Sequence, residues 1–78
     1  MDVAVTDSAT AERAALRHRR DRLTARSALL FAEAERLANS DDREALRILS
    51  DQLHEHSADL VAYHHALELF HVRLDPLR

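Results

Sequence analysis

The residues best placed to do chemistry lie in one short stretch near the end of the chain, VAYHHALELFH at positions 61–71. His64, Glu68 and His71 follow each other at intervals of four and three residues, so a helix would carry their side chains on one face. Imidazole nitrogens and carboxylate oxygens on successive turns are suitable ligands for zinc or iron. One interpretation of this stretch is therefore a metal site.

The segment Glu68-Leu-Phe-His71 matches an E-x-x-H motif and in this respect resembles the ferritin-like di-iron proteins, whose motifs project into a four-helix bundle. The resemblance covers four of the 78 residues. It implies that glutamates from a facing helix complete the site. With a turn centred on Ser40, the residue facing Glu68 would be Glu12. Under this alternative the protein is an iron or zinc bundle, with iron oxidation or storage as its activity.

A salt-bridged helix surface is the competing interpretation of the same residues, and we prefer it. The pairing that sets Glu12 against Glu68 also brings Arg13 and Arg17 close to that glutamate. Surface ion pairs contribute only about 0–1 kcal/mol each, but several together select which helices pair. This interpretation needs no cofactor, and proton sensing by the histidines is a third role. A further group of arginines is expected near Asp59, namely Arg19, Arg20 and Arg22.

Two long helices joined by one turn are predicted to position these side chains. Residues 8–38 are rich in Ala, Leu, Arg and Glu and contain neither Gly nor Pro, which favours a continuous helix. Asn, Ser and Asp then gather in a segment typical of a turn, predicted at 39–41. Asp41 and Glu44 have the spacing of a capping box, so the second helix is expected to occupy 42–74.

The ends of the chain are expected to lie outside these helices, within a single domain of 78 residues. Pro76 disfavours helical geometry at Asp75, which leaves a C-terminal tail at 75–78. Residues 1–7 are expected to form a flexible N-terminal segment.

Apolar residues repeat along the predicted second helix in alternating steps of three and four, which is the strongest pattern in the sequence. Such a repeat of 3.5 residues indicates left-handed supercoiling of packed helices. The seam consists of Leu46, Leu49, Leu53, His56, Leu60, Tyr63, Leu67, Phe70 and Leu74. The predicted first helix has a similar seam with fewer apolar residues. Leucines recur every seven residues, at Leu16, Leu23, Leu30 and Leu37. The positions between them are occupied by Arg20, Ser27 and Ala34.

These patterns predict an all-α fold in which an antiparallel two-helix hairpin pairs with a second copy to form a four-helix bundle. A core of this size rarely supplies more than about 3–5 kcal/mol, so self-association, most simply as a homodimer, is expected. Over 61–74 the helix is also apolar outside the seam, which indicates a second contact surface for the other copy or for a partner protein. Its members are Val61, Ala62, Ala66, Leu69 and Val72.

Composition excludes many familiar enzyme sites. The chain has no Gly, which rules out the dinucleotide fingerprint, the P-loop and the glycine-flanked serine elbow. It also has no Cys, and none of its serines is accompanied in sequence by a recognisable base and orienting group. We therefore expect a small non-enzymatic interaction or regulatory protein, with the metal-binding bundle as the alternative.

Charge and hydropathy indicate where such a protein would act. Six arginines lie between residues 13 and 26, but the formal net charge is −3 and no aromatic residue interleaves the run, which disfavours nucleic-acid binding. No stretch has the roughly 18 continuous apolar residues of a membrane span, and the N-terminus lacks the basic region of a signal peptide. The expected location is the cytoplasm, without a membrane partner.

Overall fold

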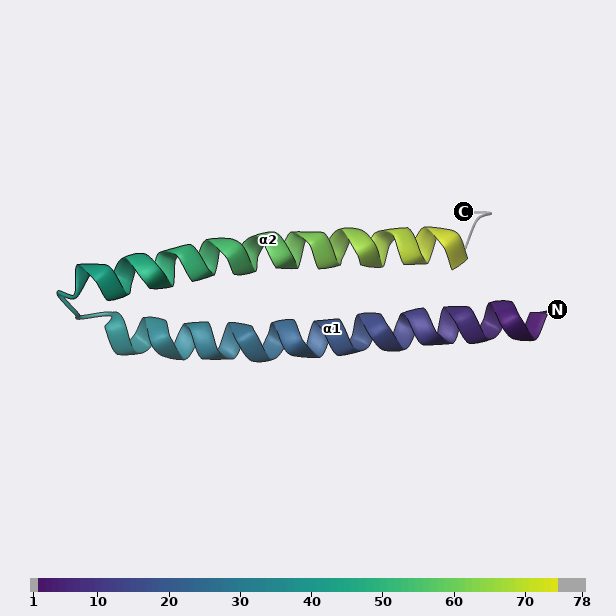
Figure 1. Ribbon diagram of the computed structural model, residues 1–78, viewed down its shortest axis with the longest axis horizontal. Helices are drawn as coiled ribbons and strands as arrows, with labels where there is room; N and C mark the ends of the chain where they lie inside the picture. Colours follow the sequence, from purple (N-terminus) through teal and green to yellow (C-terminus); the bar gives the residue numbers. More distant parts are fainter. Residues whose placement is uncertain (1, 75–78) are drawn as a thin grey trace.

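The computed structural model describes the backbone of residues 2–74 and the side chains of residues 8–73. The chain forms two helices, α1 (Asp2–Leu37) and α2 (Arg43–Leu74), which run antiparallel along each other (Figure 1). The hairpin measures 61 × 19 × 15 Å. The predicted all-helical hairpin is therefore confirmed for the described residues, which contain no strand.

Helix α1 begins earlier than the sequence predicts. It starts at Asp2 rather than at Ser8, so the backbone of residues 2–7 belongs to the helix instead of preceding it. Neither Gly nor Pro occurs before Leu37, and an established helix extends at low cost through residues that do not break it. The predicted tail at 75–78 lies outside the described residues. Neither helix of the described chain has a segment long and apolar enough to cross a membrane.

The turn between the helices ends at Asp42, whose side chain caps the N-terminus of α2. The backbone N–H of Ala45 donates to Asp42 Oδ1 at 3.0 Å, and the N–H of Leu46 donates to the Asp42 carbonyl at 3.0 Å. This is the geometry of an N-cap residue, whose side chain satisfies a backbone donor that the helix leaves unpaired. Ser40 Oγ in turn accepts the Asp42 N–H at 3.0 Å and holds the turn in shape.

The predicted cap was wrong by one residue, because the turn continues through Asp42 and α2 begins only at Arg43. We expect Asp42→Ala to lower the free energy of unfolding by about 1 kcal/mol, the usual cost of losing an N-cap. Urea unfolding followed by circular dichroism measures it. Asp41→Ala is the matched control, since it removes the same charge without the cap. Equal losses in the two variants would assign the effect to charge instead.

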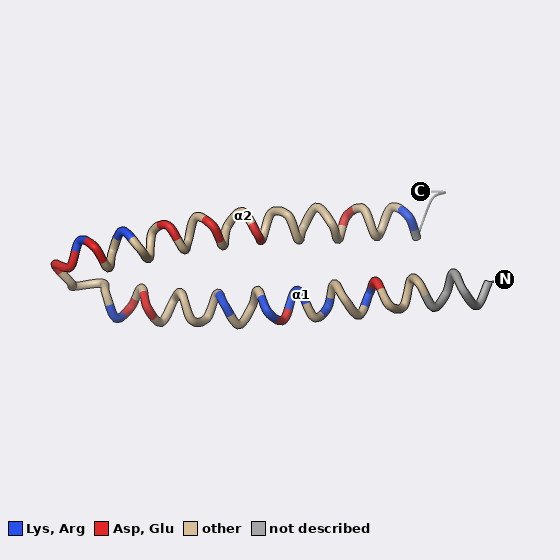
Figure 2. The backbone as a smooth tube through the Cα atoms, in the orientation of Figure 1, with Lys and Arg blue, Asp and Glu red and all other residues tan. Residues whose placement is uncertain are grey.

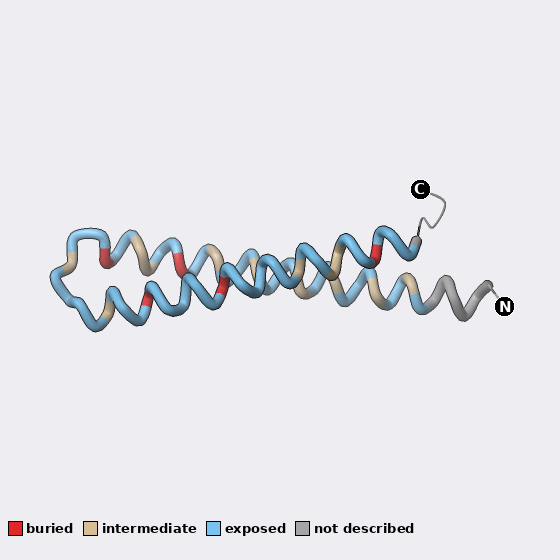
Figure 3. The backbone as a smooth tube through the Cα atoms, turned by 90° about the horizontal axis from the view of Figure 1, so that it is seen from above, coloured by how far each residue is buried: buried red, intermediate tan, exposed pale blue. Residues whose placement is uncertain are grey.

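The buried core lies between the helices and is small (Figure 3). Near the turn, Leu30 and Leu37 of α1 pack with Leu49 of α2, and Ala34 and Ala45 fill the remaining space. These residues recur at intervals of seven, or of three and four, so they keep to one line where two supercoiled helices meet. The heptad leucines of both helices thus meet as predicted in the half of the hairpin next to the turn.

The other end of the hairpin is held by an aromatic ring and charged side chains. Phe70 is the most deeply buried apolar residue, at 3 % exposure. The guanidinium carbons of Arg13 and Arg73 lie 5.9 and 6.0 Å from the centroid of its ring, within the range of a cation–π interaction. Arg73 Nη2 also lies 2.8 Å from Glu12 Oε1. This end is therefore closed by arginine stems and an ion pair across the helices.

The pairing of the helices is offset from the one predicted. Glu12 pairs with Arg73 rather than lying opposite Glu68, and Ser27 contacts His56. The reason is that side chains on a helix lean toward its N-terminus, so each covers a spot about one residue before its own Cα. In an antiparallel pair the side chains of the two helices lean in opposite directions, so the shifts in their contacts add together. Long side chains such as Glu12 and Arg73 reach further still.

Ion pairs within each helix stabilise the half of the hairpin next to the turn. Arg36 Nε donates to Glu33 Oε2 at 3.0 Å, and this hydrogen bond lowers the pKa of Glu33 and raises that of Arg36. A hydrogen bond to Glu44 likewise raises the pKa of Arg47. Because the pKa of Glu33 is lowered, this group stabilises the folded state at pH values above 4.5. The contribution is lost as the pH falls through the pKa that Glu33 has in the folded state. All these groups are exposed, so the effect is small.

Candidate functional site

The predicted seam of α2 separates into two rows in the structure. Residues of the first row face α1 and are buried or partly buried. They are Leu49, His56, Tyr63 and Phe70. The second row lies beside the first and is more open to solvent, with Leu46, Leu53 and Leu60 exposed by 38, 41 and 41 %. We call this second row the leucine strip, and its members are Leu46, Leu53, Leu60 and the partly buried Leu67.

The two rows follow from the geometry of a two-helix pair. Rows related by three or four residues lie roughly 50° apart around a helix, so a single facing helix covers one row and leaves the next at its edge. A helix in a four-helix bundle meets two neighbours and buries both rows. The heptad pattern of α2 therefore provides more apolar surface than α1 can cover. Leu74, the last predicted member of the seam, lies beyond the described side chains.

A groove adjoins the leucine strip near the chain termini. It lies between the helices, and its lining combines apolar and aromatic residues with charged residues of α1; the apolar and aromatic ones are Leu16, Tyr63, Leu67 and Phe70. The arginines on its α1 side are Arg13, Arg17 and Arg20. His71 lies on its α2 side. The strip is therefore bordered on α1 by guanidinium groups in this half of the molecule.

The predicted metal-ligating residues lie on the surface of α2. His64 Nε2 is 3.7 Å from Glu68 Oε1, and both side chains are largely exposed. His71 lies in the groove, and Glu12, which the di-iron interpretation requires opposite Glu68, is paired with Arg73. Among the described residues, no group of three His, Asp or Glu side chains is close enough to hold an ion. A metal site here would need ligands besides those that the described part of the hairpin brings together.

The predicted ion pair between Glu68 and Arg13 or Arg17 is not formed either. Among the described side chains Glu68 approaches only His64 within ion-pair distance. Arg13 instead lies over the Phe70 ring, at 5.9 Å. The Glu68 side chain is largely exposed, and the Arg13 guanidinium is taken up by the aromatic ring instead.

Ser27 and His56 form a polar pair inside the hairpin that sequence reasoning missed. His56 is 5 % exposed, and its Nε2 lies 2.6 Å from Ser27 Oγ. The imidazole Nδ1 is buried and has no hydrogen-bond partner within the described chain. A catalytic serine needs a base that is itself oriented by a third group, as well as access for substrate. Within the described chain Nδ1 has no orienting acid, so the geometry of this pair is that of a structural contact.

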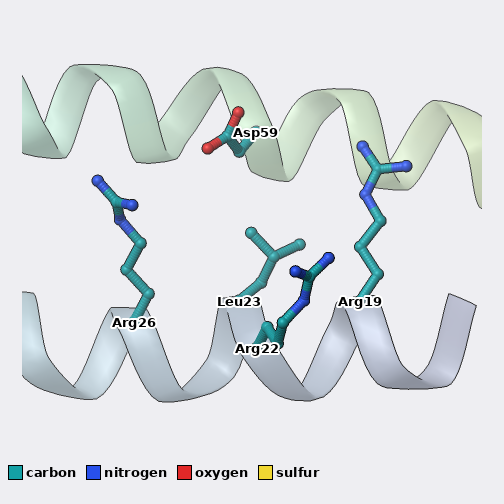
Figure 4. Close-up of a pocket in the computed structure, with 5 residues that line it drawn as sticks. All are labelled: Arg19, Arg22, Leu23, Arg26 and Asp59. Carbon is teal, nitrogen blue, oxygen red and sulfur yellow. The ribbon is translucent and has the colours of Figure 1, made fainter. Parts of the chain in front are cut away.

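A second group of arginines lines a depression on the other side of the hairpin (Figure 4). Arg19 and Arg26 extend from α1 toward α2 on either side of Asp59, and Arg22 lies beside them. Arg26 Nη2 is 3.8 Å from Glu55 Oε2. The prediction that Arg19 and Arg22 lie near Asp59 is thus confirmed.

Arg20 differs from that prediction, because it pairs with Asp21 at 2.9 Å and lines the groove beside the leucine strip. The arginines of residues 13–26 are therefore divided between two sides of α1 instead of forming one continuous basic face.

The predicted partner surface at the end of α2 is exposed in the hairpin. Val61, Leu69 and Val72 are exposed by 68, 52 and 66 %, and Ala62 is also exposed. These residues lie outside both rows of the seam, so α1 covers none of them fully. Single exposed apolar residues are normal, but three large ones within twelve positions of one helix form a patch.

Comparison with known proteins identifies no relative. No protein-family model matches the chain, and no curated protein or solved structure is significantly similar to it.

Proposed function

We propose that this protein is a non-enzymatic helical hairpin that self-associates into a four-helix bundle and acts as a small interaction or regulatory protein. The observation that supports the proposal is the leucine strip, a heptad row that lies half open beside the row that α1 covers. Regular leucines at this spacing are typical of helix pairing, because each side chain can insert between residues of a facing helix.

The length of the strip suits a contact between helices. From Leu46 to Leu67 it extends about 32 Å at about 1.5 Å per residue. A stable interface of about 800 Å² per partner is wider than one row of leucines, so the side chains flanking the strip belong to the proposed contact as well. Among the described side chains, the hairpin by itself buries few large apolar ones, namely Leu30, Leu37, Leu49 and Phe70. Covering the strip would therefore enlarge a small core considerably.

The patch formed by Val61, Ala62, Leu69 and Val72 is the second part of the proposal. It lies outside the leucine strip, so a bundle formed through the strip leaves these residues accessible. We propose that another protein docks an apolar helix or groove here, as amphipathic helices commonly do. The bundle would then serve as a scaffold that presents two copies of the patch.

Sedimentation equilibrium of the purified chain tests the proposal. We expect a dimer or a multiple of it at micromolar concentration, and a melting temperature that rises with chain concentration because association stabilises the folded state. A well-folded monomer with a concentration-independent melting temperature would contradict it.

A further inference from the structure

We propose that the leucine strip binds a second copy of the chain running in the opposite direction, so that α2 packs on α2 and the two turns lie at opposite ends of the bundle. This inference rests on the proposed self-association and adds the orientation of the two hairpins. Two independent features of the molecule lead to it, the position of the strip and the distribution of charge.

The first feature is that the strip belongs to α2 alone. Its neighbour across the groove is the part of α1 that carries Arg13, Arg17 and Arg20. Packing the strip against this part of α1 in the other copy would set leucines against these guanidinium groups. Apolar surface is buried most favourably against apolar surface. The strip therefore fits another leucine strip, and α2 pairs with α2.

The second feature is a separation of charge along the hairpin (Figure 2). The turn half, residues 27–55, has seven acidic side chains and three arginines. The open half, residues 2–26 and 56–74, has seven arginines and six acidic side chains. In Figure 2 the acidic residues concentrate around the turn and the adjoining part of α2, and the arginines along the middle of α1. The hairpin is thus strongly negative around the turn and close to neutral in the open half, where the arginines of α1 lie.

This separation distinguishes the two ways in which α2 can pair with α2. If both turns lay at the same end, the two strongly negative turn halves would adjoin. In the opposite orientation each negative half lies along an open half, which carries the arginines of α1. Exposed charges interact across about 10 Å at moderate salt, which is the spacing of packed helices. Charge complementarity of this kind determines orientation more than affinity.

The antiparallel arrangement also pairs the strip residue by residue. A twofold axis midway between Leu53 and Leu60 sets each Leu53 beside Leu60 of the other copy. The same axis sets each Leu46 beside Leu67 of the other copy. All four leucines of each strip then contact leucines, and no strip residue is left over.

Spin labels test the orientation directly. The chain has no Cys, so a single substitution carries the only label. Asn39→Cys places it on an exposed residue of the turn. In the antiparallel bundle the two labelled turns are separated by about 45 Å, because each lies about 22 Å along the helices from the axis. With both turns at one end they would be only about 10–20 Å apart. Double electron–electron resonance measures distances over this range.

Ser57→Cys supplies the matched control, because Ser57 is exposed and lies between Leu53 and Leu60. We expect a short distance, below about 20 Å, since packed helices are about 8–10 Å apart. A short distance at both positions would overturn the antiparallel orientation while leaving self-association intact. A long distance at Ser57→Cys would show that the copies meet elsewhere. Absence of dipolar coupling at both positions would mean a monomer and would overturn the proposed function as well.

Discussion

Replacing Leu53 and Leu60 together with glutamate is expected to abolish self-association at micromolar concentration. Each side chain is 41 % exposed in the single hairpin, so covering that part contributes roughly 0.6–1.2 kcal/mol per leucine. Two leucines from each copy are lost, and four carboxylates are introduced at the centre of the contact. We expect the dimer to weaken by at least about 100-fold, since every 1.4 kcal/mol is a factor of ten.

Sedimentation velocity over a range of concentrations measures the change in association. We also expect less helical signal in circular dichroism, because the remaining core of one hairpin is small and isolated helices are marginal in water. The matched control is Val61→Glu with Val72→Glu, which adds the same charge to α2 outside the strip. The strip would be the wrong surface if the control dissociated the dimer and the strip variant did not.

The fold followed from the sequence because two signals agreed over long segments. Alternating steps of three and four along α2, and the absence of Gly and Pro along α1, both indicate long helices, and the Asn, Ser and Asp of the connection indicate a single turn. The cap was misplaced by one residue because Asp41 and Asp42 have equal capping ability. Only the hydrogen bond from the Ala45 N–H identifies Asp42 as the cap.

The arrangement of side chains was harder to predict, because it depends on how the helices are offset. Counting outward from Ser40 set Glu12 against Glu68, but the lean of side chains toward the helix N-terminus instead brings Glu12 to Arg73. The Glu12 that the di-iron interpretation sets opposite Glu68 is therefore engaged by Arg73. Correcting for the lean would also have brought Ser27 and His56 together, since both belong to the predicted seams.

The split of the α2 seam into two rows has a different origin. Sequence periodicity shows that residues share a broad face of a helix, but it does not show how many neighbours that face meets. One facing helix buries Leu49 and Phe70 and leaves Leu53 and Leu60 open. The pattern therefore carries information about an assembly larger than one hairpin, which is why the leucine strip supports the proposed bundle.

The second large effect is expected at the buried polar pair. Ser27→Ala removes the hydrogen-bonding partner of His56 Nε2 and leaves both ring nitrogens without a partner inside the hairpin. A buried polar group left unsatisfied costs about 1–3 kcal/mol. We therefore expect Ser27→Ala to lower the free energy of unfolding by that amount. Urea unfolding at one fixed chain concentration measures it, because association contributes to stability.

The companion variant His56→Leu is expected to act in the opposite direction. It replaces a buried ring that has one unpaired nitrogen by a leucine like its neighbours in the seam. Together with Ser27→Ala it exchanges both polar partners for apolar groups, which can be neutral or stabilising. Combined with Ser27→Ala it should recover the stability that Ser27→Ala loses alone, and the double-mutant cycle then isolates the energy of the pair. If Ser27→Ala proved as stable as wild type, the 2.6 Å contact would contribute nothing to folding.

If His56 costs stability, its presence in the seam requires another explanation, and we infer that it specifies the alignment of the helices. The hydrogen bond to Ser27 can form at only one offset, whereas leucines repeating every seven residues pack almost equally well after a shift of one heptad. A single polar residue in a coiled-coil seam is known to select register and oligomer state in this way. His56→Leu with Ser27→Ala should therefore be stable but less uniform, and sedimentation velocity should resolve more than one oligomer. A single dimeric species in that variant would show that the leucines alone set the alignment.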